Sequence, residues 1–264
     1  MKKMRLVFAM SVGLIGGWLA VAVVGVVHAE DILRVSLPDL PSLAEKTPDG
    51  QMKGLGYEFY VALAKEMDVT LNVSLVPLAR ILKEMEYGET DTTFLVENPK
   101  VAKFSHSVAS LNVKLLSMVF ISRMDAPVRA LQDLAGKVVG HPRGGGVLAK
   151  LVDLSVVREH EVGNYTQGIQ MLQANRLDVV FGTQMPIYHS IKQLGISLDQ
   201  FAPPLVGSET PVWFYFSKRS PNQALRERMQ LAIEKLIQNG TFAKIEEQYR
   251  LCFMEGKDCA AINY

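Results

Sequence analysis

In the first half of the chain, segments with a strand-like pattern of apolar residues alternate with segments in which apolar residues recur every three to four positions. Residues 32–37, 69–76 and 92–96 are rich in β-branched or apolar side chains and predict strands. Between them, the apolar positions of residues 55–67 and 78–85 recur at helical spacing. This order of strand, helix, strand, helix and strand is typical of a parallel sheet with helices on its faces.

The second half repeats the alternation. Its expected elements are strands at 137–140, 178–181 and 212–216, and helices at 147–152, from Asn164, at 185–191, from Ser220-Pro221 to Asn239-Gly240, and from Thr241. Gln167 stands three residues after Asn164, as in a capping box. Two α/β units predict two lobes. The extended apolar segments 115–122 and 205–216 are the candidates for carrying the chain between them, so we expect two crossings.

The N-terminus has the layout of a secretory signal. Lys2, Lys3 and Arg5 precede an apolar run, residues 6–27, that contains no charged residue. Small residues then stand at positions −3 and −1 of a cleavage site after Ala29. A cleaved leader is the favoured interpretation. The run is also long enough to span a bilayer, so a retained anchor is the alternative.

Charge and cysteine content narrow the function of the remaining body. The whole chain carries 28 basic and 27 acidic residues, and the leader holds three of the basic ones and none of the acidic ones. The body is therefore slightly negative, which excludes a strongly basic nucleic-acid binder. Cys252 and Cys259 fit a small loop-closing disulfide in an oxidising compartment. Free thiols and a metal or redox role are the alternatives.

Most catalytic signatures are absent from the sequence. It contains no Gly-x-Ser-x-Gly, His-Glu-x-x-His or Cys-x-x-Cys motif, and the P-loop lysine is missing after Gly145. The run Glu159-His160-Glu161 holds a single imidazole, so we expect a solvated turn in preference to a metal site. We therefore expect no metal and no cofactor.

One glycine-rich segment remains as a candidate binding element. Arg143, Gly144, Gly145 and Gly146 join a predicted strand to a helix. Bare backbone amides at a helix start can hold an anion, and Arg143 would add a forked donor for a carboxylate or phosphate. The alternative is a tight turn with Arg143 in solvent.

Short motifs along the body, in this order and spacing, resemble a known family. The motifs are Ile32-Leu-Arg-Val, Asp49-Gly-Gln-Met-Lys-Gly-Leu, Val76-Pro-Leu-Ala-Arg80, Gly88-Glu-Thr-Asp91, Phe104-Ser105, Leu131-Gln-Asp-Leu-Ala-Gly-Lys137, Gly140-x-x-x-Gly144, Asn175-Arg-Leu-Asp178 and Asn239-Gly-Thr-Phe-Ala-Lys-Ile245. The chain resembles solute-binding protein family 3, the periplasmic amino-acid-type receptors of ABC transporters, over about residues 32–250.

The resemblance implies an α/β chain with the type II periplasmic-binding-protein fold. In that fold two α/β lobes are joined by two crossing strands, and a ligand in the cleft between them drives a hinge closure. The implied organisation is a signal peptide at 1–29, a first lobe at 30–112 that is completed at 207–250, a second lobe at 113–206, and a tail at 251–264.

The chain departs from the family at the residues that hold an amino acid. The family's arginine for the α-carboxylate is missing from residues 97–104, where Lys100 or Lys103 is the substitute. The family's aspartate for the α-amino group is replaced by Thr183, and the ring-bearing residues of the first loop are replaced by Leu40 and Leu43. The stretch from Asn164-Tyr-Thr-Gln-Gly168 to Thr183-Gln184 resembles an atypical branch of the family, in which the usual anchors are also altered. We expect a ligand other than a standard α-amino acid.

Several side chains are candidates for lining the cleft. Arg80 begins a helix of the first lobe and points either into the cleft or onto the surface of its own lobe. Tyr165 begins a helix that borders the cleft in the family, as a lining residue or as part of the packing. Thr183 and Gln184 follow the carboxyl end of a buried strand. Trp213 lies on a crossing strand, where core packing is the favoured interpretation and ligand stacking the alternative. Asp91 and Asp178 are expected to hold loops at strand starts.

These observations favour a monomeric periplasmic receptor that captures a small polar solute, with an anionic solute as the specific case, and delivers it to an ABC permease. A ligand sensor that signals to a separate membrane receptor is the main alternative. A dehydratase-like enzyme on the same fold is a third, and the missing acid–base pair counts against it. No nucleic acid is expected as a partner, and the membrane is involved only through the leader.

Overall fold

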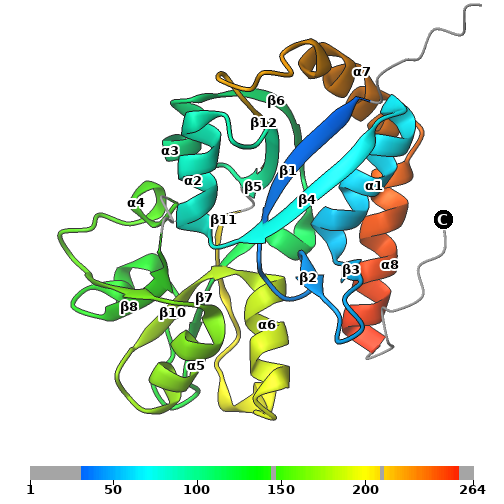
Figure 1. Cartoon of the computed structure of the whole chain (residues 1–264). Helices are drawn as coiled ribbons and strands as arrows, with labels where there is room; N and C mark the ends of the chain where they lie inside the picture. The colour runs from blue at the N-terminus through cyan, green and yellow to red at the C-terminus, as the bar shows by residue number, and fades with distance from the viewer. Residues whose placement is uncertain (1–30, 144–146, 209–210, 256–264) are drawn as a thin grey trace, which may run out of the picture. The chain divides into compact units, whose positions relative to one another are not determined.

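The computed structural model of the chain describes three stretches of the sequence, residues 31–143, 147–208 and 211–255 (Figure 1). Three predictions concern parts of the chain outside the described residues: the leader (1–29), the glycine amides (Gly144, Gly145 and Gly146), and the disulfide between Cys252 and Cys259, since the side chain of Cys252 is not described either. These stay predictions. Within the described stretches, every helix is too short or too polar to span a lipid bilayer.

Five strands form the first sheet, in the order β4-β1-β5-β12-β6. They are β1 (Ile32–Pro38), β4 (Thr70–Val76), β5 (Thr92–Val96), β6 (Ser105–Leu111) and β12 (Val212–Ser217). Strand β1 pairs in parallel with β4 and β5, which confirms the parallel unit that the first half of the sequence predicts. Strand β12 returns late in the chain and pairs antiparallel with β5 and β6.

Helices cover both faces of the first sheet. One face carries α1 (Leu55–Met67), α7 (Ala224–Gln238) and α8 (Thr241–Glu255), and the other carries α2 (Leu78–Tyr87) and α3 (Pro99–Ala102). In Figure 1, α1 and α8 run side by side on their face. Successive side chains of a strand alternate between the two faces. Phe94 therefore packs with Phe59 of α1 at a ring separation of 5.4 Å, whereas Leu95 packs with Ile81 of α2.

The second sheet has the order β11-β7-β10-β8-β9. Its strands are β7 (Met118–Ser122), β8 (Val138–Pro142), β9 (Arg158–Val162), β10 (Val179–Thr183) and β11 (Leu205–Ser208). Helices α5 (Tyr165–Gln173) and α6 (Gln184–Gln193) pack on one face around Ile121 and Val180, and α4 (Leu148–Leu151) packs on the other around Phe120 and Phe181. Mixed α/β structure with two sheets confirms the predicted fold class.

The chain passes between the sheets twice, as the sequence predicts. The outward passage runs from β6 through the 3-10 turn Lys114–Leu116 into β7, and the return runs from β11 to β12. The remaining short elements are the hairpin of β2 (Glu45–Lys46) and β3 (Met52–Lys53) and the 3-10 turns Leu131–Leu134 and Leu198–Gln200.

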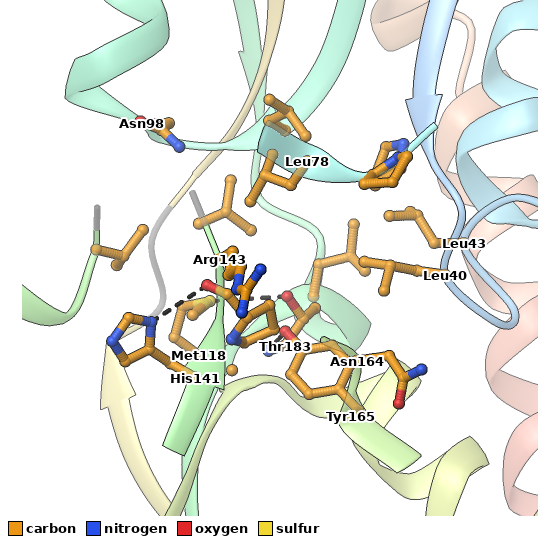
Figure 2. Close-up of a pocket in the computed structure, with 18 of the residues that line it drawn as sticks. Leu40, Leu43, Leu78, Asn98, Met118, His141, Arg143, Asn164, Tyr165 and Thr183 are labelled. Carbon is orange, nitrogen blue, oxygen red and sulfur yellow. Dashed lines mark hydrogen bonds between the residues drawn. The ribbon is translucent and has the colours of Figure 1, made fainter. Parts of the chain in front are cut away.

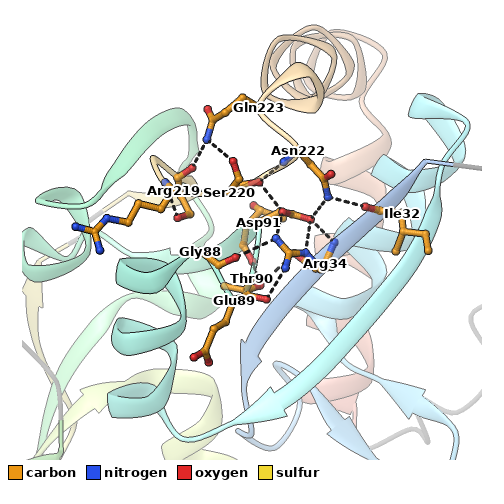
Figure 3. Close-up of polar contacts among 12 residues, drawn as sticks. Ile32, Arg34, Gly88, Glu89, Thr90, Asp91, Arg219, Ser220, Asn222 and Gln223 are labelled. Carbon is orange, nitrogen blue, oxygen red and sulfur yellow. Dashed lines mark hydrogen bonds and ion pairs between the residues drawn. The ribbon is translucent and has the colours of Figure 1, made fainter.

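Two buried or half-buried aspartates hold strand starts, as expected. Asp91, directly before β5, accepts hydrogen bonds from the backbone and guanidinium of Arg34 at 2.6–3.2 Å, from Ser220 Oγ at 2.6 Å and from Asn222 Nδ2 at 3.1 Å (Figure 3). This cluster, called here the Asp91 clasp, ties β1 and β5 to the segment before α7. Asp178 Oδ2 accepts from the backbone N–H of Val138 at 2.8 Å and so joins β10 to β8.

Three local predictions are wrong. The long helix begins at Ala224, and Ser220 stays outside it because its hydroxyl bonds Asp91. Glu159–Glu161 belongs to the exposed edge strand β9 and forms no turn, because it extends the sheet beside β8. Asn164 does cap α5, but Gln167 Oε1 accepts from the N–H of Gly163 and not from that of Asn164, so the capping box is displaced by one residue.

Candidate functional site

A cavity of about 550 Å³ lies where the two sheets face each other (Figure 2). The carboxyl ends of four parallel-type strands reach it: Pro38 of β1, Val96 of β5, Pro142 of β8 and Thr183 of β10. Ligands of open α/β sheets bind at this end of the strands, because loops and helix starts there are free to carry specificity. The volume falls in the range of cavities that hold small molecules.

The walls of the cavity are mostly apolar. Side chains from both sheets and from the loop after β1 contribute Leu40, Leu43, Leu78, Phe94, Met118 and Phe181. Leu40 and Leu43 come from a loop that folds back on α1. Gly54, with φ 127°, makes this possible, because a Cβ there would overlap the carbonyl of Leu43. The two leucines of the first loop thus line the cavity, and a ligand that fills it must bury apolar surface.

Tyr165 and Thr183 form a neutral floor on the second sheet. The Tyr165 hydroxyl accepts a hydrogen bond from the backbone N–H of Thr183 at 3.0 Å, and burial raises the pKa of the phenol. Gly182 leaves room for this ring, since any Cβ at that position would overlap it. Thr183 Oγ1 also lies 3.8 Å from Met118 Sδ. Tyr165 therefore both packs in the core and lines the cavity, so it serves both roles that the sequence left open.

Charged groups stand at the cavity edges. Arg143 lines it with a side chain that is 71% exposed, and its Nε lies 3.8 Å from Glu161 Oε2. Asp39 is exposed on the first-sheet side. His141 also lines the cavity, is buried, and is held at both ring nitrogens, with Nε2 at 3.1 Å from Glu159 and Nδ1 at 3.2 Å from the Pro142 carbonyl. The ring of His141 is fixed, whereas Arg143 is available to a ligand.

Two asparagines line the cavity, one from each sheet. Asn98 caps α3 and Asn164 caps α5, and in each the side-chain oxygen accepts from a backbone N–H, that of Lys100 at 2.9 Å and that of Gln167 at 2.8 Å. Because that N–H can only donate, the accepting atom is the amide oxygen. The amide nitrogen of each asparagine is left with two donors.

Four predicted site residues do not line this cavity. Arg80 is engaged by Glu84 at 2.8 Å and Glu89 at 3.0 Å on the surface of α2. Gln184 begins α6, and Lys100 lies on α3 beyond the lining. Trp213 packs with Tyr215 on the α2 face of the first sheet, at a ring separation of 6.5 Å. Its Nε1 is buried without a hydrogen-bond partner among the described residues.

Two polar contacts connect the two halves of the chain through residues that do not line the cavity. Lys150 of α4 pairs with Glu97, which follows β5, at 2.7 Å. Ser42 of the first loop lies 2.9 Å from Nδ1 of His189 on α6. Burial, aided by nearby Lys53 and Lys192 and opposed by Glu45, lowers the pKa of His189. The unprotonated nitrogen of a neutral imidazole can accept a hydrogen bond from the Ser42 hydroxyl.

The described residues hold no cluster of three or more His, Cys, Asp or Glu side chains that could bind a metal ion. The cavity can bury a small molecule and hold it in one orientation by hydrogen bonds from both sheets. It therefore has the chemistry of a binding pocket whose contacts come from two halves of the chain.

Comparison with known proteins agrees with this geometry. The sequence matches the family described as bacterial extracellular solute-binding proteins, family 3, over residues 34–251. The chain belongs to this family. The probable amino-acid-binding protein YxeM of Bacillus subtilis (strain 168) is a relative that is 22% identical over 209 residues, which cover 76% of this chain and 77% of the relative.

Solved structures show the same type II periplasmic-binding-protein fold. An ancestral arginine-binding protein bound to arginine superposes with a TM-score of 0.67 at 20% identity, covering 84% of this family 3 chain and 99% of its own. A histidine kinase sensor domain with similarity to periplasmic binding proteins reaches a TM-score of 0.71 at 17% identity, covering 84% and 96%. At these identities the likeness establishes the fold.

Asp39, Asn98 and His141 also line the cavity and are not among the residues predicted from the sequence. Asn98 carried a usable signal. It stands two residues after the end of a predicted strand and directly before Pro99, and Asn followed by Pro is typical of a helix start. A helix start at the carboxyl end of a strand belongs to the ligand-binding edge of the sheet. His141 lay inside the glycine-rich motif but had no spacing partner in the sequence.

Proposed function

We propose that the chain is an exported periplasmic receptor that captures one small solute in the cavity between its sheets and delivers it to an ABC permease. The observation that carries this proposal is the cavity itself, which takes lining residues from the strand ends of both sheets. A solute that contacts both halves favours their closed arrangement by the difference in its affinity for the two states. Membership of family 3 and the basic, apolar leader support the extracellular assignment.

The ligand we propose is a small solute with polar groups, anionic where it meets Arg143, and not a standard α-amino acid. Neither Lys100 nor Lys103 lines the cavity, so no basic side chain from residues 97–104 replaces the family's carboxylate-binding arginine there. Thr183, at the place of the amino-binding aspartate, carries no charge and is buried. A charged hydrogen bond contributes about 1.5–3 kcal/mol, so the loss of two anchors is decisive for affinity.

A ligand sensor is the second candidate function, favoured by the likeness to a histidine kinase sensor domain. The cavity would serve both functions equally. They differ in the partner: loss of the chain abolishes uptake of the ligand in the transport case. In the sensor case uptake persists, and only the transcriptional response to the ligand disappears.

A thermal-stability screen of the purified chain against a panel of small metabolites tests capture. A ligand at 100 times its Kd adds about 2.7 kcal/mol of stability, or roughly 5–10 °C in Tm for a chain of this size. Mass spectrometry of the recovered ligand should show it chemically unchanged, whereas a dehydrated product would indicate the enzyme alternative.

A pair of variants on α2 ties any stabilisation to the cavity. Ala79 is exposed and lines the cavity, so Ala79→Trp should fill it and abolish the shift. Lys83 is exposed on the same helix and lies outside the lining, so Lys83→Trp should keep the shift. A panel without any stabilising member, or an equal shift in both variants, would contradict the proposal.

A further inference from the structure

Asn98 is the most deeply buried polar side chain with unused donors in the cavity wall. Its residue is only 3% exposed, and its backbone N–H donates to the hydroxyl of Tyr215 at 3.0 Å. Its side-chain oxygen is taken by the N–H of Lys100. The Tyr215 bond holds the backbone of Asn98, and the Lys100 bond orients its side-chain amide. No further partner for the amide nitrogen occurs among the described residues.

The fixed orientation directs the amide nitrogen of Asn98 to the cavity. Figure 2 shows this nitrogen on the cavity side of the side chain. This nitrogen is open to the cavity, since Trp213 Nε1 is the one fully buried side-chain nitrogen or oxygen without a partner among the described residues. A donor at a cavity wall is satisfied by water or by a ligand. Because the surrounding wall is formed by Leu78, Phe94 and other apolar side chains, a ligand that displaces water here must supply an acceptor.

We propose that Asn98 is a specificity-determining residue and that the ligand has an apolar body and an oxygen-acceptor head, a carboxylate in the first place, which the Asn98 amide holds. This inference rests on the proposed function of the cavity and names its ligand class. An amide –NH₂ can donate to an oxygen but cannot accept from an ammonium group. Arg143 in the same lining adds a second donor and no acceptor, which favours a carboxylate over a neutral carbonyl.

Asn164 offers a natural comparison for Asn98. It also caps a helix through its oxygen and lines the cavity with its nitrogen free, but its side chain is exposed. A hydrogen bond in water is worth less than the same bond in a dry wall, because water competes for the donor. The structure thus provides two equivalent caps that differ in burial.

A head-group series on one alkyl chain tests the class of ligand. Calorimetric titration with hexanoate, hexanamide and hexylamine keeps the apolar body constant and changes only the head. Hexanoate should bind most tightly and hexylamine most weakly, by about tenfold or more, since one charged hydrogen bond separates them. Tighter binding of hexylamine than of hexanoate would overturn the inference.

Two substitutions keep the helix caps and replace the amide donor at the cavity wall by a carboxylate acceptor. Asp and Asn are equally good capping residues, so Asn98→Asp and Asn164→Asp retain the bonds to the helix starts. Asn98→Asp should lower hexanoate affinity about 10- to 100-fold and raise that of hexylamine, whereas Asn164→Asp should change either by less than about threefold. Asn98→Ser keeps a capping side chain without burying a charge, so it tests the loss of the donor even if Asn98→Asp fails to fold. It should lower hexanoate affinity about fivefold or more.

The outcomes separate this inference from the proposed function. Unchanged hexanoate affinity in both Asn98 variants would refute the role of Asn98 while leaving the cavity as the binding site. If another class in the metabolite panel stabilised the chain through the cavity and the carboxylates did not bind, the ligand class would be wrong and capture would stand. If no compound bound, both would fail.

Discussion

The two ends of strand β5 use buried polar side chains in opposite ways. Asp91, directly before the strand, is fully buried and every hydrogen-bonding position of its carboxylate is occupied by the Asp91 clasp. Asn98, two residues after the strand, is nearly as buried but keeps two donors unused at the cavity wall. A saturated group stabilises the fold, and an unsaturated one at the ligand-binding edge is available for recognition.

The difference follows from the position of each residue in the sheet. The amino end of β5 lies against the segment before α7, which supplies Ser220 and Asn222. The carboxyl end opens on the cavity, where the chain supplies mostly hydrocarbon. Stability and binding should therefore respond separately to changes at the two ends.

The largest expected effect is at the clasp. Asp91→Asn leaves Arg34 without its counter-charge and should lower the free energy of unfolding by about 3–5 kcal/mol, as for other broken buried ion pairs. Urea denaturation measures this. The folded fraction of the variant should bind ligand as the wild type does, and a loss below about 1 kcal/mol would show that the clasp is not structural.

The Asp91 clasp also makes the free energy of unfolding depend on pH in the acid range. Burial alone would raise the pKa of Asp91, but the hydrogen bonds from Arg34, Ser220 and Asn222 outweigh it and lower the pKa below its ordinary value. The stabilisation is therefore complete above the unfolded-state pKa of about 3.9 and is lost as the pH falls through the lower folded-state value. The wild-type advantage over Asp91→Asn should shrink in acid, and a constant difference would contradict this assignment.

An intermediate effect is expected at the contact that orients Asn98. Tyr215→Phe removes the hydroxyl that accepts the Asn98 N–H and leaves a buried donor unpaired, at a cost of about 1–3 kcal/mol. Ligand affinity should fall several-fold as well, since the backbone that carries the Asn98 side chain loses this constraint. If stability fell and affinity stayed constant, the orientation of Asn98 would depend on the Lys100 bond alone.

Glu58 on α1 is a half-buried carboxyl that, unlike Asp91, has no set of hydrogen-bond donors among the described residues to stabilise its charge. Burial raises its pKa to about 7 from 4.5. The folded state then holds the proton to higher pH than the unfolded chain, so stability is complete below pH 4.5 and declines as the pH rises through 7. Glu58→Gln should be more stable than the wild type at pH 8, by about 1 kcal/mol after solvent screening, and equal at pH 4. Equal stability of Glu58→Gln and the wild type at pH 8 would contradict a raised pKa of Glu58.

The smallest effect is expected at the ion pair that joins α4 to the segment after β5. Lys150 and Glu97 are both partly exposed, and such pairs contribute about 0.2–1 kcal/mol. Lys150→Met should weaken ligand binding by less than about fivefold, with the loss reduced at high salt. Calorimetric titration of the ligand at two salt concentrations measures both effects. A loss of ligand affinity above tenfold would contradict a minor role and show that the ion pair contributes to closure.

Much of the fold is predictable from the sequence because local patterns encode it. The spacing of Leu55, Phe59, Leu63 and Met67 predicts α1, and all four are buried as one face. The edge strand β9 escaped prediction because Arg158, Glu159, His160 and Glu161 are exposed and carry no apolar alternation. An edge strand depends on pairing with its neighbour, which a local pattern does not encode.

The cavity is harder to predict because it is assembled from distant segments. Arg143, Tyr165 and Thr183 were found from strand ends and helix starts, and the structure brings them together. Arg80 was a plausible candidate by position, but its partners Glu84 and Glu89 hold it on the surface. Which side chains already have a partner is a property of the folded chain.

Native mass spectrometry of the chain after incubation with a bacterial small-molecule extract tests the central claim most directly. We predict one small-molecule adduct on the wild type and on Lys83→Trp, and none on Ala79→Trp. The absence of an adduct on the wild type, or an equal adduct on all three, would contradict capture of a solute in the cavity between the sheets.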